Sequence, residues 1–488
     1  MNLYVISIGG TGHRVTTALL NLAAAGAVPA GKIKLICVDS DTANGNLNML
    51  TESIKAYDDA SCNGNTFPTS LETAQMGNKD IHNPCWSPTV VDNQTLENAM
   101  KKQAMDINGQ RIFDFLYTNE EQTVSLDRGF YGHTSIGSLL MAEQIRPDGS
   151  NFCKEWEMFF NGFDSNNDRI MLIGSTFGGT GASGLPVIST ILRQTYPDAK
   201  IAALLVMPYF KFNNAAADAG DNGININWAY FIPKTRADLN YYEKQNFDKI
   251  FNEIFIIGED PDNFMNVKYS IGSTQQSNKP HVIELYAASA AIDFLRSACD
   301  KYTVKVMGRF ENAEDGREMS SLSMLNDANG DKTTAQKVAS FMRAAVMYTK
   351  YYYHCLKNGK KNGNWYGYYN DIDDNELDRL YTFCMKYIDW FKLAELTNDS
   401  NGECSVNPAN NVEFFSLMDG DLYNGIPDLS MFKNILIKNI NTIEQLVTEK
   451  QSDNAEAIDQ TFSELSKEDY NGTDLGKLVK CLQQACEI

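Results

Sequence analysis

Two glycine-rich turns, each placed after an apolar run and before a helical pattern, are the residues of this chain best suited to bind a phosphate. The first is Gly9-Gly10-Thr11-Gly12-His13-Arg14, after the strand-like run 3–8. The second is Gly178-Gly179-Thr180-Gly181-Ala182-Ser183, after the run 169–173. Glycine lets the backbone approach a phosphate closely, and free N–H groups at a helix start attract negative charge. Two such turns in one α/β domain predict a nucleotide held at both ends of its phosphate chain.

The second turn lacks the Lys of the G-x-x-x-x-G-K-[ST] pattern, so it is not a Walker loop. It resembles the Gly-Gly-Gly-Thr-Gly-[Ser/Thr]-Gly signature of tubulin and FtsZ, with 178–181 matching fully and 182–184 loosely. A helix start at 185–188, a strand at 201–207 and Pro208-Tyr209-Phe210 then follow in the order typical of FtsZ. Over about residues 1–300 the chain therefore resembles a divergent prokaryotic member of the tubulin/FtsZ-like GTPase superfamily.

The resemblance implies GTP or GDP with Mg²⁺ as the ligand. The two turns would hold the phosphates, and Asp39 and Asp41, which end the second strand, would lie near the magnesium. The sequence singles out no side chain as a metal ligand. A looser match at 128–137 suggests a third phosphate-side loop, and Asn227 resembles the Asn that contacts guanine in tubulin. The further residues implied for the site are Gly132 and His133 of that loop, with Arg14 and His133 neutralising phosphate charge, and Tyr286 stacking on the base. An exposed Asn at a helix start and a core Tyr are the ordinary alternatives.

The catalytic acid is the point at which this chain departs from the family. In polymerising members the neighbouring subunit completes the active site with an Asn-x-Asp motif on the loop after the central helix. No clear motif of this kind follows residue 296. The acids considered for this role are Glu311, Glu314, Asp315 and Asp327. A solvated acidic face is the usual meaning of such a cluster.

Three classes of function remain open at this stage. The resemblance implies a GTPase that assembles head to tail into filaments. The missing acid motif favours a second class, a non-polymerising GTP-binding switch or scaffold for a protein partner, for example in bacterial defence. A third class is a Rossmann NAD-dependent oxidoreductase, with the first turn as its dinucleotide turn and Asp39 as its ribose acid. This last class leaves the second turn without a role.

Composition narrows the partners further. The formal net charge of −20 disfavours nucleic acid and anionic membranes as partners. No apolar stretch approaches the length that spans a membrane, and the first residues lack a signal-peptide pattern. The ten cysteines form no C-x-x-C, and with five histidines no zinc pattern emerges. These features predict a cytoplasmic protein without membrane insertion.

The order of the expected elements predicts an α/β fold with a Rossmann-type parallel sheet. Strands are expected at 3–8, 34–38, 169–173, 201–207 and 254–257, and the polar stretch 51–91 is expected to be an irregular insertion. Apolar residues at helical spacing predict a long central helix at 281–297. The expected domains are a nucleotide-binding domain at 1–280, this central helix, and a C-terminal α/β or α-rich domain at 298–488.

Overall fold

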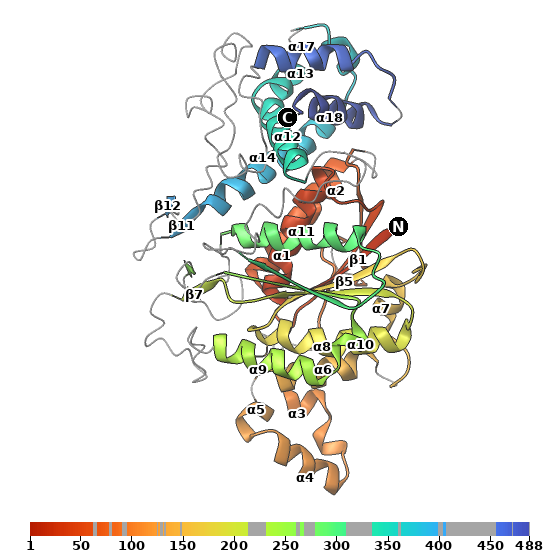
Figure 1. Cartoon of the computed structure of the whole chain (residues 1–488), viewed down its shortest axis with the longest axis vertical. Helices are drawn as coiled ribbons and strands as arrows, with labels where there is room; N and C mark the ends of the chain where they lie inside the picture. The colour runs from red at the N-terminus through yellow and green to blue at the C-terminus, as the bar shows by residue number, and fades with distance from the viewer. Residues whose placement is uncertain are drawn as a thin grey trace.

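The computed structural model describes residues 1–61, 66–77, 81–89, 95–123, 125–126, 130, 133–146, 149–212, 231–259, 264–267, 279–308, 334–359, 363–398, 404–406, 455–470 and 472–487. A parallel sheet lies at the centre of this part of the chain (Figure 1). Its strands run in the order β10-β8-β6-β5-β1-β2-β3, and β4 also pairs with β2. Their bounds are β1 (Asn2–Ile8), β2 (Lys32–Val38), β3 (Ser70–Thr73), β4 (Cys85–Trp86), β5 (Arg169–Ser175), β6 (Lys200–Val206), β8 (Glu253–Gly258) and β10 (Thr303–Gly308).

Every pairing in this sheet is parallel. Its central strands are buried on both faces, which explains why they appear in the sequence as continuous apolar runs. In β1, Leu3 and Val5 enter one hydrophobic core, whereas Tyr4 and Ile6 enter the other. The predicted α/β fold with a parallel sheet is confirmed.

Helices cover both faces of the sheet (Figure 1). One face carries α1 (Gly9–Ala24), α2 (Gly45–Ser61) and α11 (Val282–Arg296). The other carries α6 (Thr134–Ile145), α8 (Gly179–Thr195), α9 (Phe231–Lys244) and α10 (Phe247–Ile250). Between β4 and β5 the chain also forms α3 (Leu96–Ala99), a 3₁₀ turn (Lys102–Ala104), α4 (Ile107–Leu116), α5 (Asn119–Thr123) and α7 (Lys154–Phe159). A short parallel pair, β7 (Phe210–Phe212) and β9 (Met265–Val267), lies outside the main sheet.

The described residues of the stretch 51–91 include a helix and two strands, in contrast to the irregular insertion that the polar composition suggested. The helix α2 continues to Ser61, and β3 and β4 both pair with β2. The polar residues of this stretch include the exposed side of α2, while Leu50, Ile54 and Tyr57 are buried on its other side. In residues 51–61 the polar positions are therefore the exposed side of an amphipathic helix rather than a loop.

The predicted helix at 281–297 is α11. The strand that follows it, β10, pairs in parallel with β8, so the sheet continues past residue 298. The helix α11 packs against α1, and both cover the face of the sheet from which the C-terminal helices extend (Figure 1).

The C-terminal region is rich in helices. The elements described there are α12 (Thr334–Met347), a π-helical turn (Tyr348–Tyr352), α13 (Tyr353–Lys357), a 3₁₀ turn (Tyr366–Tyr368), α14 (Asp374–Glu395), the antiparallel pair β11 (Leu396–Asn398) and β12 (Cys404–Val406), α17 (Ala455–Leu465) and α18 (Asp474–Ala485). Aromatic rings join this region to the α2 side of the sheet, with the Phe383 ring centroid 4.7 Å from that of Phe67 and 5.8 Å from that of Tyr57. The apolar core is therefore continuous between the two regions.

Candidate phosphate-binding site

The two glycine turns lie at the point where the order of the strands reverses. From β1 the chain builds the sheet outward through β2 and β3, and then returns to the other side of β1 to place β5. In open α/β sheets, ligands bind outside the carboxyl ends of the strands at such a point. The helix α1 begins directly after β1, and α8 begins at Gly179, shortly after β5 ends at Ser175. The fold therefore brings both turns to this edge of the sheet.

The turns are in direct contact with each other. Gly9 has a φ of +69°, and a Cβ at this position would lie 3.2 Å from the Cβ of Thr180 and 3.3 Å from the nitrogen of Gly181. A Cβ at Gly12 would lie 2.6 Å from the carbonyl oxygen of Ile173, in β5. These contacts require small residues in the first turn, since a side chain would separate α1 from the second turn and from β5.

Both helices start without a capping side chain. The N-cap residues are Ile8 for α1 and Gly178 for α8, neither cap makes a side-chain hydrogen bond, and neither first turn contains an acidic residue. The first N–H groups of a helix have no partner within it, and the helix dipole places partial positive charge there. The partly exposed backbone positions of the two turns are Gly10, Thr11, Gly178 and Gly179, whereas Gly9, Gly12, Thr180 and Gly181 are buried. This arrangement can bind an anion that reaches both helix starts.

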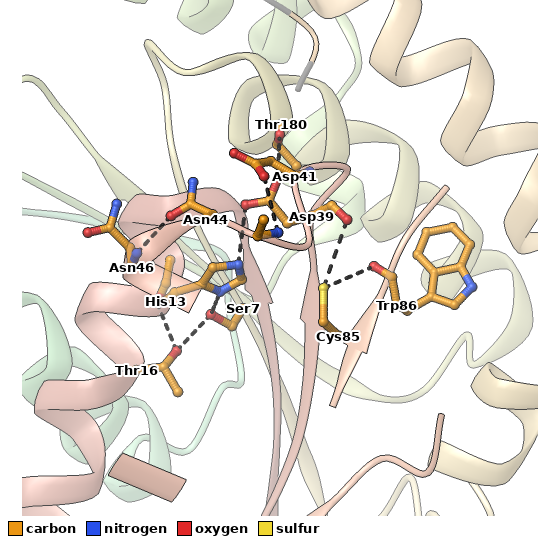
Figure 2. Close-up of polar contacts among 12 residues, drawn as sticks. Ser7, His13, Thr16, Asp39, Asp41, Asn44, Asn46, Cys85, Trp86 and Thr180 are labelled. Carbon is orange, nitrogen blue, oxygen red and sulfur yellow. Dashed lines mark hydrogen bonds and ion pairs between the residues drawn. The ribbon is translucent and has the colours of Figure 1, made fainter. Parts of the chain in front are cut away.

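A buried chain of polar contacts connects the turns through the end of β2 (Figure 2). The Ser7 Oγ and the His13 Nδ1 are 2.9 Å apart, and the His13 Nε2 lies 3.4 Å from the Asp39 Oδ2. The Thr180 hydroxyl donates to the Asp39 Oδ1 over 3.3 Å. At the other end, the Thr16 hydroxyl donates to the Ser7 Oγ over 3.0 Å. Asp39 therefore contacts a residue from each turn and holds the two turns together.

The loop after β2 supports the first turn from the side. Asp41 is buried, its Oδ1 accepts from the Ala43 N–H, and its own N–H donates to Asp39. The Asn44 Oδ1 accepts from the Asn46 N–H, and a Cβ at Gly10 would lie 2.9 Å from the Asn46 Nδ2. Sequence reasoning missed both Asn residues, although their position just after two Asp residues at a strand end was an available signal.

Arg14 is not placed as a free cation of the turn. It is buried, its Nε donates to the Glu284 Oε1 of α11 over 2.7 Å, and the Tyr209 hydroxyl donates to the same oxygen over 2.9 Å. Burial lowers the pKa of Arg14, but the charge and hydrogen bonds of Glu284 and Tyr209 leave this pKa above its ordinary value. Burial also raises the pKa of Glu284, against the opposing charge of Arg14. The charge of Arg14 is thus matched by a buried carboxylate, and the pair joins α1 to α11.

The other predicted residues occupy several different environments. The Ser183 hydroxyl is buried and donates to the Gly179 and Thr180 carbonyl oxygens, over 2.7 and 3.1 Å. Ala182 and Tyr286 are buried. His133 precedes α6, and its Nδ1 lies 3.1 Å from a Glu121 carboxylate oxygen. The predicted residues that lie outside the described part of the chain are Gly132, Asn227, Glu311, Glu314, Asp315 and Asp327.

The start of α9 also reaches the second turn, which the sequence did not indicate. The Thr235 and Thr176 hydroxyls are 3.1 Å apart, and the Lys234 Nζ lies 3.5 Å from the Gly178 carbonyl oxygen. More than 50 residues separate Lys234 from Gly178 along the chain. No spacing pattern connects them, so only the fold reveals this contact.

Among the described residues, no group of three or more His, Cys, Asp or Glu is placed to hold a metal ion. Magnesium commonly needs only one or two carboxylates, because phosphate oxygens and water complete its shell. Among the same residues, no helix is both long and apolar enough to cross a membrane.

Comparison with known proteins adds a distant structural similarity. No protein-family model and no curated protein matches the sequence. Among solved structures, the chain is similar to CetZ from Methanosaeta thermophila strain DSM 6194, at 13% sequence identity and a TM-score of 0.24. The similarity covers 53% of this chain and 46% of that chain, so this chain spans less than half the length of CetZ. CetZ is a tubulin/FtsZ-family protein. A similarity this weak carries no argument. The strand order and the site geometry define the chain as a parallel α/β protein with paired glycine turns.

Proposed function

We propose that this protein binds GTP with Mg²⁺ across the two glycine turns, hydrolyses it, and assembles head to tail in a nucleotide-dependent manner. The observation that supports the binding step is the contact of two uncapped helix starts, at Gly9 and Thr180–Gly181, beside partly exposed backbone. Guanine as the base, hydrolysis and assembly come from the sequence resemblance to tubulin and FtsZ.

The residues present suit a nucleoside triphosphate. The N–H groups at the start of α1 and α8 would bind phosphate oxygens. Bound Mg²⁺ would neutralise phosphate charge. Its candidate protein ligands are the carboxylates of Asp39 and Asp41, which follow β2. Asp39 also accepts the Thr180 hydroxyl and therefore positions the second turn. The buried Ser40 hydroxyl, between these two acids, has no hydrogen-bond partner in the part of the chain that the structure describes, and it adds a polar group suited to a ligand.

The geometry supports phosphate binding over the dinucleotide alternative. In a dinucleotide site Asp39 would accept hydrogen bonds from ribose hydroxyls, whereas here it accepts from the Thr180 hydroxyl and so connects the second turn to the first. The second turn would also have no role in a Rossmann oxidoreductase, although it contacts the first.

Calorimetric titration of the protein with GTP, ATP and NAD⁺, each with Mg²⁺, tests the binding step.

Thr11 is the third residue of α1 and is partly exposed. We expect Thr11→Glu to weaken GTP binding about 100-fold, since a charge about 5 Å from a phosphate at an effective dielectric constant of about 20 costs roughly 3 kcal/mol. The same substitution should leave stability unchanged or raise it by about 0.3–1 kcal/mol, because an acid in a first helical turn is favourable.

Thr11→Gln is the matched control, because it has the same size without the charge. Equal GTP affinities for the Glu and Gln variants would exclude phosphate from this turn. Tight binding of NAD⁺ without GTP binding would support the oxidoreductase instead.

A second measurement separates the assembling GTPase from a monomeric switch. GTP turnover per molecule and light scattering are recorded over a range of protein concentrations. Turnover that rises steeply above a threshold, together with scattering, is expected if the neighbouring subunit completes the active site. Binding with slow turnover that is independent of concentration would instead identify a switch or scaffold.

A further inference from the structure

The helix α9 lies along the first turns of α8, as their adjacent positions in Figure 1 show. Three successive contacts align them: the Thr235 hydroxyl reaches Thr176, the Lys234 Nζ reaches the Gly178 carbonyl oxygen, and the Tyr242 hydroxyl donates to the Ala182 carbonyl oxygen over 3.0 Å. The Phe231 ring also packs on Phe177, with centroids 4.9 Å apart. The residues 234, 238 and 242 follow helical spacing, so they share the side of α9 that faces α8.

Lys234 brings an ammonium group to the second glycine turn. Its ammonium group lies beside the start of α8, where the helix dipole is positive and cations are disfavoured. Burial lowers the pKa of Lys234, and the charge of Asp238 opposes this shift. Burial raises the pKa of Asp238 to about 6, and one of its carboxylate oxygens is buried without a hydrogen-bond partner among the described residues. An anion at the start of α8 would interact favourably with both the helix dipole and the ammonium group.

We infer that Lys234 contacts the terminal phosphate of the nucleotide at the second turn. This assignment rests on the proposed function, since it requires a nucleoside triphosphate across the two turns. The arrangement would supply from α9 the point charge that a Walker loop supplies from its own Lys. Asp238, one helical turn after Lys234, offsets part of the cost of holding an ammonium group beside α8.

The test compares Lys234→Gln with Lys244→Gln. Lys244 is the exposed last residue of the same helix, so its variant controls for the loss of a charge on α9. Calorimetry measures the affinity of each protein for GTP and for GDP, both with Mg²⁺. Lys234→Gln should weaken GTP binding about 10- to 50-fold and GDP binding less than about threefold. Lys244→Gln should bind both nucleotides like the wild type.

A labelling experiment on the unmodified protein covers the case in which Lys234→Gln does not fold. Acetic anhydride modifies accessible amines, and mass spectrometry then reports the modification at each lysine. GTP should protect Lys234 several-fold more than GDP does, and Lys244 should react equally with either nucleotide.

The outcomes separate this assignment from the proposed function. If the wild type binds no nucleotide, the proposed function fails, and the assignment of Lys234 fails with it. If the wild type binds GTP but Lys234→Gln binds it as tightly as Lys244→Gln does, the proposed function stands and Lys234 has no phosphate role. Equal losses for GTP and GDP would overturn its placement at the terminal phosphate.

Discussion

Replacing Arg14 by Met tests whether this residue joins two helices or neutralises a phosphate. Arg14 is 4% exposed and Glu284 is 1% exposed, with the Nε of one 2.7 Å from the Oε1 of the other. Removing one partner of a buried ion pair leaves an uncompensated charge, which typically costs about 3–5 kcal/mol. We therefore expect Arg14→Met to lower the free energy of unfolding by about that amount at neutral pH.

The loss should depend on pH with a defined sign. Burial already raises the pKa of Glu284 with Arg14 present, and without Arg14 this pKa rises further. Between the unfolded pKa of about 4.3 and the folded pKa, the folded state of the variant binds more protons than the unfolded state. The contribution of Glu284 to stability is thus fully present below the unfolded pKa and is lost as the pH rises through the folded pKa. The slope from this one group is at most about 1.4 kcal/mol per pH unit.

Urea unfolding of the wild type, Arg14→Met and the double variant Arg14→Met/Glu284→Gln, at pH 5 and pH 8, measures both effects. The single variant should lose more stability at pH 8 than at pH 5, relative to the wild type. The double variant should not show this added pH dependence, because Gln carries no charge. If Arg14→Met kept full stability at both pH values but lost GTP affinity, Arg14 would be a phosphate ligand and our account of the pair would be wrong.

Three further substitutions probe the contact between the turns. Gly12→Ala places a Cβ 2.6 Å from a backbone oxygen of β5, so urea unfolding should show a loss of about 1–3 kcal/mol, and unchanged stability would contradict this packing. Thr180→Val removes the hydroxyl that donates to Asp39, and the same assay should show a loss of about 1.5–3 kcal/mol, because hydrogen bonds to charged groups are worth that much. Ser183→Ala should leave GTP affinity within about twofold, because the Ser183 hydroxyl donates to carbonyl oxygens of its own helix, and a tenfold loss by calorimetry would show that it turns toward the phosphate instead.

Local sequence patterns were sufficient to predict most strands of the sheet and both glycine turns. The strand predicted at 169–173 is β5, which extends two residues further, and the strand predicted at 254–257 lies within β8. Such buried parallel strands are recognisable because both of their faces require apolar side chains. The prediction for the α2 part of 51–91 was wrong because this helix has one apolar face, and its exposed polar residues resemble those of a loop.

Contacts between distant segments could not be predicted in the same way. Arg14 and His13 follow the same glycine turn, yet one pairs with Glu284 of α11 and the other lies against Asp39. Which acid each base meets depends on which strands and helices become neighbours. Lys234 is a clearer case, since nothing in its local sequence relates it to the second turn.

The sequence by itself determined where the backbone can approach an anion, because glycine and a helix start are local properties of a few consecutive residues. It also determined the parallel α/β class, because a strand buried on both faces consists of consecutive apolar residues. Only the tertiary structure decided that β1 and β5 are neighbours, that Gly9 touches Thr180, and that Asp39 holds the two turns together. The physical reason is that these contacts depend on the order of strands in the sheet, which arises from the packing of the whole chain.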